Sequence, residues 1–79
     1  MKIKILGPGC PKCQTLEQRT REVVSELQLN AEVLKVEDIM DIMHYGVMMT
    51  PAMVIEETVV IKGRLPSKEE ISESIKKFL

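Results

Sequence analysis

The sequence has almost no aromatic residues: Tyr45 and Phe78 are the only two, and there is no tryptophan. It also lacks an excess of positive charge, because its formal net charge is −1. Proteins that bind nucleic acid need basic groups for the phosphates and aromatic faces for the bases. A nucleic-acid partner is therefore not expected. Without aromatics, we expect the core to be built from Ile, Leu, Val and the six methionines.

Long apolar runs are also missing, and none approaches the roughly 20 residues that are needed to cross a bilayer. The first nine residues, "MKIKILGPG", do not resemble a secretory signal, because their apolar stretch is short and is interrupted by Lys4. We therefore expect no membrane association and a cytoplasmic location. The 79 residues allow one domain, residues 1–79, which we expect to be monomeric.

Cysteine is scarce as well: Cys10 and Cys13 are the only two, within the stretch "GPGCPKCQ". In a reducing compartment such a pair is more often catalytic or metal-binding than structural. Closing a four-residue ring would stabilise the fold by only roughly 2 kcal/mol, against about 4.7 kcal/mol for a 100-residue loop. A purely structural disulfide is therefore disfavoured.

A metal site is the second interpretation of this cysteine pair. A closed zinc site needs four ligands, and His44, the only histidine, lies far downstream without ligand-like spacing. We expect His44 to be solvated near the end of a helix. A soft ion such as Cu(I) needs only two thiolates, so a small Cu(I)-type carrier stays an alternative function. Such carriers run βαββαβ and end on a strand. Otherwise we expect no cofactor and no metal.

The hydrophobic pattern predicts seven elements. Strands are expected over residues 2–6, 31–37, 50–55 and 58–62, and helices from Pro11 to about Leu29–Asn30, from Asp38 to about Gly46, and from Ser67 onward. Ser67 and Glu70 have the spacing of a capping box. A two-residue loop, Glu56–Glu57, would join the last two strands, although such hairpins prefer Asn-Gly or Asp-Gly.

The start of the first expected helix favours redox chemistry for the two cysteines. Pro11 suits the first helical position, so Cys10 becomes the N-cap residue. The positive end of the helix dipole and the unpaired N–H groups favour a thiolate there, which is the attacking species. Cys13 lies one turn further in and should be shielded, as suits a thiol that resolves a mixed disulfide. Lys12 either supports the thiolate or is simply solvated.

With these elements in place, the chain resembles the thioredoxin fold, and more narrowly the small prokaryotic thioredoxin-like proteins called redox-active disulfide proteins. The resemblance covers almost the whole chain and rests on the segments "CPKC" (10–13), "GVMMTPAMVI" (46–55) and "GRLPSKEEI" (63–71). It implies an α/β, glutaredoxin-sized βαβαββα fold with a four-stranded mixed sheet of order 2-1-3-4. The first two strands should be parallel. The first and third helices should share one face, with the second helix on the other.

The resemblance also implies a function, namely a thiol–disulfide oxidoreductase that reduces protein disulfides. It implies that Cys10 is the nucleophile, that Cys13 is the resolving thiol, and that Pro51 is cis and packs against the disulfide. The residues expected to bind substrate are Thr50, through its backbone, and Met49, Pro11 and Lys12. We hypothesise that Met48 or Met49 lines an apolar groove beside Cys10. The implied partners are disulfide-containing proteins and a thioredoxin-reductase-like flavoprotein that regenerates the dithiol.

The sequence departs from this family at two places. Typical thioredoxins carry Trp-Cys-Gly-Pro-Cys and a buried acid six residues before the first cysteine, whereas here Gly9 precedes Cys10 and Lys4 occupies that position. The usual proton acceptor is therefore missing from its place. Pro11 directly after Cys10 is glutaredoxin-like, but no basic residue stands just before the pair to hold a glutathione carboxylate. Protein disulfides are thus the expected substrates.

Overall fold

A computed structural model describes all 79 residues and has the element order βαβαββα. The strands are β1 (Lys2–Leu6), β2 (Glu32–Val36), β3 (Ala52–Ile55) and β4 (Thr58–Lys62). The helices are α1 (Pro11–Glu26), α2 (Ile39–His44) and α3 (Lys68–Lys76). The predicted order is confirmed, and the chain ends on a helix rather than on the strand of a Cu(I) carrier. None of the helices has the length and apolar content to cross a membrane.

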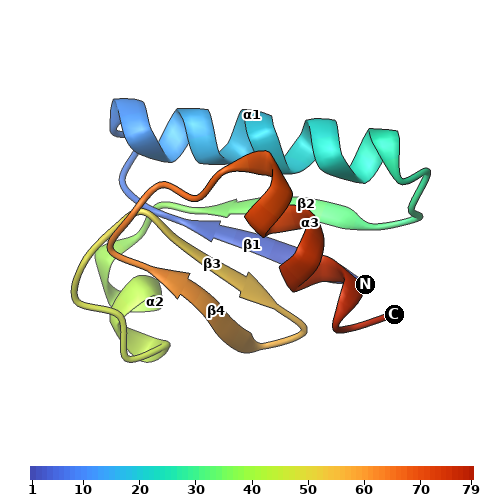
Figure 1. Cartoon of the computed structure of the whole chain (residues 1–79). Helices are drawn as coiled ribbons and strands as arrows, with labels where there is room; N and C mark the ends of the chain where they lie inside the picture. The colour runs from blue at the N-terminus through green and yellow to red at the C-terminus, as the bar shows by residue number, and fades with distance from the viewer.

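The four strands form one mixed sheet of order β2-β1-β3-β4, as predicted. β1 pairs in parallel with β2 and antiparallel with β3, and β3 is antiparallel to β4. Helices α1 and α3 cover one face of the sheet and α2 lies on the other (Figure 1). The two central strands, β1 and β3, are therefore covered on both sides, and every residue of β3 is buried.

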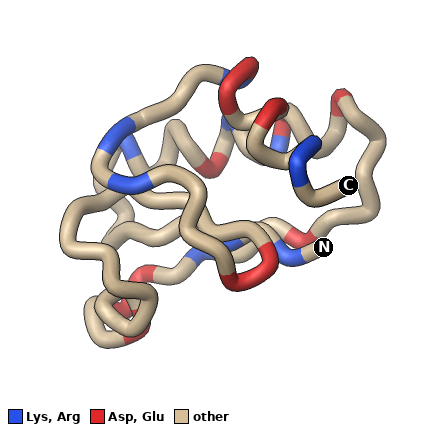
Figure 2. The backbone as a smooth tube through the Cα atoms, turned by 60° about the horizontal axis from the view of Figure 1, so that its bottom comes forward, with Lys and Arg blue, Asp and Glu red and all other residues tan.

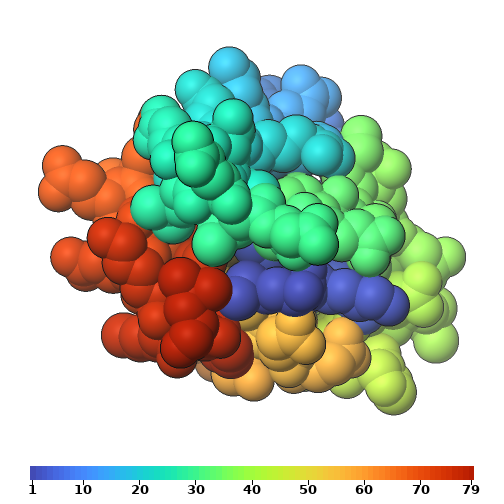
Figure 3. Space-filling view, turned by 90° about the vertical axis from the view of Figure 1, so that its right-hand side faces the viewer, coloured from blue at the N-terminus to red at the C-terminus, as the bar shows by residue number.

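Each face of the sheet has its own hydrophobic cluster, because successive side chains of a strand point to opposite faces. The cluster beneath α1 and α3 consists of Ile3, Ile5, Leu16, Val23, Met53, Ile55, Ile61, Ile71 and Ile75. The cluster on the α2 face consists of Leu6, Ile42, Val47, Ala52 and Val54. Figure 3 shows the end of the molecule where the C-terminal residues lie beside β1.

Methionine contributes less to the core than the composition suggested. Met53 is the only fully buried methionine, and Met1 packs at the edge of the larger cluster. The other four have exposed side chains: Met40, Met43, Met48 and Met49. The expectation that all six fill the core is therefore wrong, and aliphatic residues build most of it.

Helix α1 ends at Glu26, three to four residues before the predicted end. Its last turn is closed by a Schellman motif, in which Leu29 N–H donates to Val24 O at 3.0 Å and Gln28 N–H to Ser25 O at 3.1 Å. Gln28 takes the left-handed conformation, with φ of 54°. Glycine normally occupies this place, so the sequence carries no signal for the stop, and the apolar Leu27 and Leu29 extend the apparent pattern.

The β3–β4 hairpin has the predicted two-residue loop despite its unfavourable residues. Glu56 and Glu57 both have positive φ, 47° and 66°, as a type I′ turn requires. Glu56 is held from outside the hairpin, because Lys2 N–H donates to its carboxylate at 2.8 Å. Figure 2 shows the two acidic residues side by side at this turn. β3 begins at Ala52 rather than Thr50, two residues later than predicted.

Helix α3 begins as predicted after Ser67, whose Oγ accepts a hydrogen bond from Glu70 N–H at 3.2 Å. The second half of the predicted capping box is absent. The Glu70 carboxylate instead forms a two-pronged ion pair with the Arg64 guanidinium. The N-terminus of α3 is thereby tied to the loop that follows β4.

Candidate active site

The loop between β1 and α1 contains two glycines that the local structure requires. Gly7 extends the parallel ladder, because its N–H donates to Val36 O at 2.9 Å. A Cβ on Gly7 would collide with the Sγ of Cys13 and lie 3.0 Å from the Cβ of Cys13. Gly9 has φ of 92°, a conformation that favours glycine. The loop can therefore bring the start of α1 directly against the end of β1.

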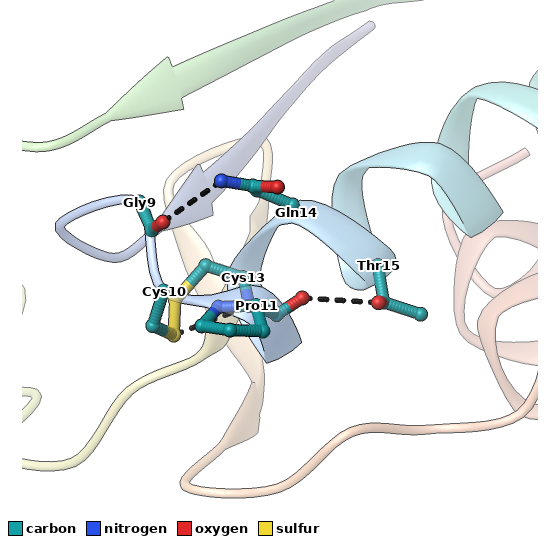
Figure 4. Close-up of a disulfide and its surroundings, with 6 residues drawn as sticks. All are labelled: Gly9, Cys10, Pro11, Cys13, Gln14 and Thr15. Atoms are coloured by element: carbon teal, nitrogen blue, oxygen red, sulfur yellow. Dashed lines mark hydrogen bonds between the residues drawn. A yellow bond between two sulfur atoms is a disulfide. The ribbon is translucent and has the colours of Figure 1, made fainter.

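Cys10 and Cys13 form a disulfide at the start of α1 (Figure 4), with their Cα atoms 5.1 Å apart. Cys10 is the N-cap residue, and its Sγ accepts a hydrogen bond from Cys13 N–H at 3.3 Å. Pro11 stands at the first helical position, as predicted. A thiolate formed at Cys10 would thus have a backbone donor already aimed at it, at the positive end of the helix dipole.

The two cysteines differ in their exposure. Cys10 is only half-buried, whereas Cys13 is 5% exposed. Gln14 closes the loop beside them, since its Nε2 donates to Gly9 O at 3.0 Å (Figure 4). Pro11 and Lys12 are both exposed on the outer side of the pair, and Lys12 makes no hydrogen bond or ion pair within the chain. An incoming disulfide can therefore reach Cys10 more easily than Cys13.

The Thr50–Pro51 peptide bond is cis, and Pro51 is buried. A Cβ on Gly7 would lie 3.8 Å from Thr50 Cβ as well as against Cys13, so Thr50 and Cys13 flank Gly7. The carbonyl of Pro51 accepts from Gly63 N–H at 3.0 Å, but the backbone N–H and C=O of Thr50 have no partner within the chain. Free main-chain groups therefore lie beside the disulfide.

An apolar groove of about 240 Å³ extends from this loop toward α2. Its lining consists of Pro8, Ile39, Ile42, Met43, Val47, Met48 and Thr50. Met48 is 96% exposed, so it forms the outer wall of the groove. Met49 does not line it; its side chain lies over Gly63 on the β4 side. Sequence reasoning missed the contribution of α2, although Ile39 and Met43 are separated by four residues and so share one face of that helix.

Lys4, which replaces the acid expected six residues before Cys10, lies away from the disulfide. Its Nζ contacts Glu57 Oε1 at 2.7 Å and Tyr45 OH at 2.6 Å. The Glu57 carboxylate, and then the Tyr45 hydroxyl, raise the pKa of Lys4 above its ordinary value. Lys4 in turn lowers the pKa of Glu57. The β1 side chain that reaches the region behind Cys13 is Ile5, because it points to the opposite face from Lys4.

A pocket of about 320 Å³ lies directly behind Cys13. It is lined by Ile5, Gly7, Gly9, Cys13, Gln14, Glu17, Lys35 and Glu37. Three of these side chains are charged, and sequence reasoning did not assign a role to any of them. The only signal for Glu17 is its position four residues after Cys13, which places both on one side of α1.

His44 is exposed at the end of α2, and its ring meets that of Tyr45 edge-on with centroids 6.2 Å apart. No group of three or more His, Cys, Asp or Glu side chains is arranged to hold a metal ion.

Comparison with known proteins gives a consistent answer over nearly the whole chain. Residues 1–76 match the family described as thioredoxin domain. A thioredoxin of Methanocaldococcus jannaschii is 39% identical over 77 residues, covering 98% of this chain and 88% of the relative. A thioredoxin of Methanothermobacter thermautotrophicus is 42% identical over 71 residues, covering 90% and 92%. The structure of thioredoxin 1 from Thermosipho africanus shares the fold, with a TM-score of 0.67 at 20% identity, covering 99% of this chain and 93% of that one.

Proposed function

Because this chain belongs to the thioredoxin family, we propose that Cys10 is the nucleophile and Cys13 the resolving thiol of its reaction. The chain is a thiol–disulfide oxidoreductase with a redox-active Cys10–Cys13 disulfide, and the family activity is the reduction of protein disulfides. The observation that carries the assignment of roles is the difference in exposure between the two cysteines.

In the proposed reaction, the Cys10 thiolate attacks one sulfur of a substrate disulfide and forms a mixed disulfide, releasing the first substrate thiolate. The Cys13 thiolate then attacks Cys10 Sγ, which forms the Cys10–Cys13 bond and releases the second substrate thiolate. Two electrons pass to the substrate. The N-cap position of Cys10 supports the first step, since the backbone N–H of Cys13 already points at its sulfur.

We further propose that the substrate binds as an extended segment along residues 48–51. The unpaired backbone groups of Thr50 would form strand-like hydrogen bonds with it, while cis-Pro51 holds this segment beside the disulfide. We propose that the exposed residues Met49, Pro11 and Lys12 contact the flanking residues of the substrate. Met48 would contact its apolar side chains through the groove.

Thioredoxins act on disulfide substrates and are returned to the dithiol form by a reductase. We propose that the substrates here are protein disulfides and that the reductase is a thioredoxin-reductase-like flavoprotein. We also propose that the reaction takes place in the cytoplasm, where proteins of this kind keep thiols reduced.

The experiment that tests the assignment of roles compares Cys10→Ser with Cys13→Ser in insulin reduction. Both variants should lose turnover, but only Cys13→Ser should retain a stable mixed disulfide with the substrate, because its nucleophile is intact and its resolving thiol is gone. Mass spectrometry under non-reducing conditions detects that adduct. A trapped adduct in Cys10→Ser instead would contradict the proposal.

A further inference from the structure

The pocket behind Cys13 is lined by a shielded acid, whereas Lys4 occupies the position of the usual acid six residues before Cys10. Glu17 lies on α1 one turn after Cys13, and both residues line this pocket. The Glu17 side chain is 19% exposed, so it is shielded although it lies at the edge of the helix. The pocket volume of about 320 Å³ is large enough to hold water molecules.

Cationic groups hold the Glu17 carboxylate at this place. Arg21 Nε donates to Glu17 Oε2 at 3.0 Å from the next turn of α1, and Arg21 Nη2 lies 2.9 Å from the same oxygen. Lys35 Nζ, from β2, lies 3.9 Å from Glu17 Oε1. Lys35 is paired with Ile5 in the parallel ladder, so it reaches the pocket from the sheet side. The carboxylate is thus fixed from two elements.

Glu37 is the other acid that lines the pocket, and its environment differs. Glu37 is exposed and has no ion pair, and its carboxylate lies over Gly9, 3.3 Å from where a Cβ on that residue would be. β1 contributes no charged group to the pocket, only Ile5. The charged residues that line the pocket are therefore Glu17, Lys35 and Glu37, and Glu17 is the shielded and oriented acid among them.

We propose that Glu17 is the proton acceptor for Cys13. The inference rests on the proposed function, in which Cys13 is the resolving thiol. In the resolving step the Cys13 thiol gives its proton, through a water molecule in the pocket, to the Glu17 carboxylate. The resulting thiolate attacks Cys10 Sγ, the Cys10–substrate bond breaks, and the substrate leaves as a thiolate. In reduction of the Cys10–Cys13 disulfide by the reductase, protonated Glu17 returns the proton to the Cys13 thiolate.

The test follows the two steps separately in the full chain. Reduced protein is mixed rapidly with an aryl disulfide whose released thiolate is coloured: the first equivalent reports attack by Cys10 and the second reports attack by Cys13. Glu17→Gln should slow the second phase at neutral pH by at least about tenfold, because positioned acid–base groups contribute 10²–10⁴-fold. The first phase should stay within about twofold of the original protein.

The pH profile separates proton transfer from a structural effect. In the original protein the second phase should depend only weakly on pH near neutrality. In Glu17→Gln the rate of the second phase should rise steadily toward alkaline pH, because the solvent then has to remove the proton from the Cys13 thiol. Glu17→Asp keeps a carboxylate and should recover part of the rate. Glu37→Gln, the matched control, should leave both phases unchanged.

Three results would overturn the assignment of Glu17: a second phase in Glu17→Gln within twofold of the original at every pH, equal slowing of both phases, or slowing in Glu37→Gln alone. Failure of the proposed function looks different, because the first phase would then survive in Cys10→Ser. Urea unfolding of each variant accompanies the kinetics, and Glu17→Asp carries the test if Glu17→Gln unfolds.

Discussion

Gly7 determines how closely the disulfide can approach the sheet. Because Gly7 has no side chain, Cys13 Sγ fills the space beside it. Cys13 is buried, so its side chain cannot rotate toward solvent to make room for a methyl group on residue 7. Gly7→Ala should lower the free energy of unfolding by about 1–3 kcal/mol, as overpacking does in other cores. It should also reduce disulfide-reduction activity. Urea unfolding and insulin reduction measure the two effects.

Gly46→Ala is the control for this substitution. Gly46 has φ of 74°, and a Cβ there would meet no atom within 4 Å. Its replacement should therefore cost only the left-handed strain, about 1 kcal/mol, and leave activity unchanged. Equal loss of activity in Gly7→Ala and Gly46→Ala would show that the collision with Cys13 is not the cause of the loss in Gly7→Ala.

The Lys4–Glu57–Tyr45 cluster makes a testable contribution to pH-dependent stability. The pKa of Glu57 is lowered in the folded state by Lys4, so its contribution is present above the ordinary glutamate range and is lost as the pH falls through the folded pKa. The pKa of Lys4 is raised, so its contribution is lost only at strongly alkaline pH. Glu57→Gln should therefore be less stable than the original protein at neutral pH.

The difference should shrink as the pH is lowered below about 4, where glutamates in general take up protons. Urea titrations at a series of pH values measure it. Glu73→Gln is the matched control, because Glu73 is an exposed acid without an ion pair. A stability difference for Glu57→Gln that stays constant from neutral to acid pH would contradict this interpretation.

At the scale of elements, the end of α1 offers a site where the chain can be stabilised. Gln28 occupies the left-handed position of the Schellman motif, which glycine adopts without steric cost. Gln28→Gly should raise the free energy of unfolding by roughly 0.5–1 kcal/mol, the left-handed strain exceeding the entropy cost of glycine. Gln18→Gly, at an exposed position inside the same helix, should lower it by about 1 kcal/mol. Urea unfolding measures both changes in the free energy of unfolding and shows whether they have opposite signs.

The elements that could be predicted are those with local signals. β1 alternates apolar and polar residues, β4 was placed at its observed bounds, and Ser67 marks the start of α3. Cys10 and Cys13 were placed correctly at the start of α1 for the same reason, since Pro11 and the preceding glycines are adjacent in sequence. Interactions between residues that are close in sequence were sufficient to predict these features.

The features that could not be predicted depend on contacts between distant residues. The turn at Glu56–Glu57 is held by Lys2 and Lys4, more than 50 positions away. The approach of Thr50 to the disulfide follows from the pairing of β3 with β1, and family resemblance alone suggested it. The position of Lys35 near Glu17 requires the register of the parallel β1–β2 ladder. The methionines of α2 are exposed, although the composition suggested that they would pack in the core.

On the scale of the whole molecule, one region contains no Lys, Arg, Asp or Glu, whereas charged residues of both signs are scattered over the rest (Figure 2). Between Asp41 and Glu56 the only ionisable side chains are those of His44 and Tyr45. This segment carries the groove residues Met43 and Met48 and leads to Thr50 beside the disulfide. A protein substrate can therefore bury apolar side chains here next to the reacting sulfurs, without removing charges from water.

Met48 tests whether this surface selects protein substrates. Met48→Ala removes most of an exposed apolar side chain at the groove wall. It should raise KM for insulin about three- to tenfold, which corresponds to roughly 0.7–1.4 kcal/mol, about half of what full burial of such a side chain contributes. The reaction with a small aryl disulfide should be unaffected, because such a substrate does not fill the groove. Met40→Ala is the control: Met40 is 73% exposed on α2 but does not line the groove. If Met48→Ala leaves insulin reduction unchanged, the groove is not part of substrate binding. If it slows the reduction of insulin and of the aryl disulfide equally, Met48 affects the reactivity of the disulfide and not the recognition of a protein substrate.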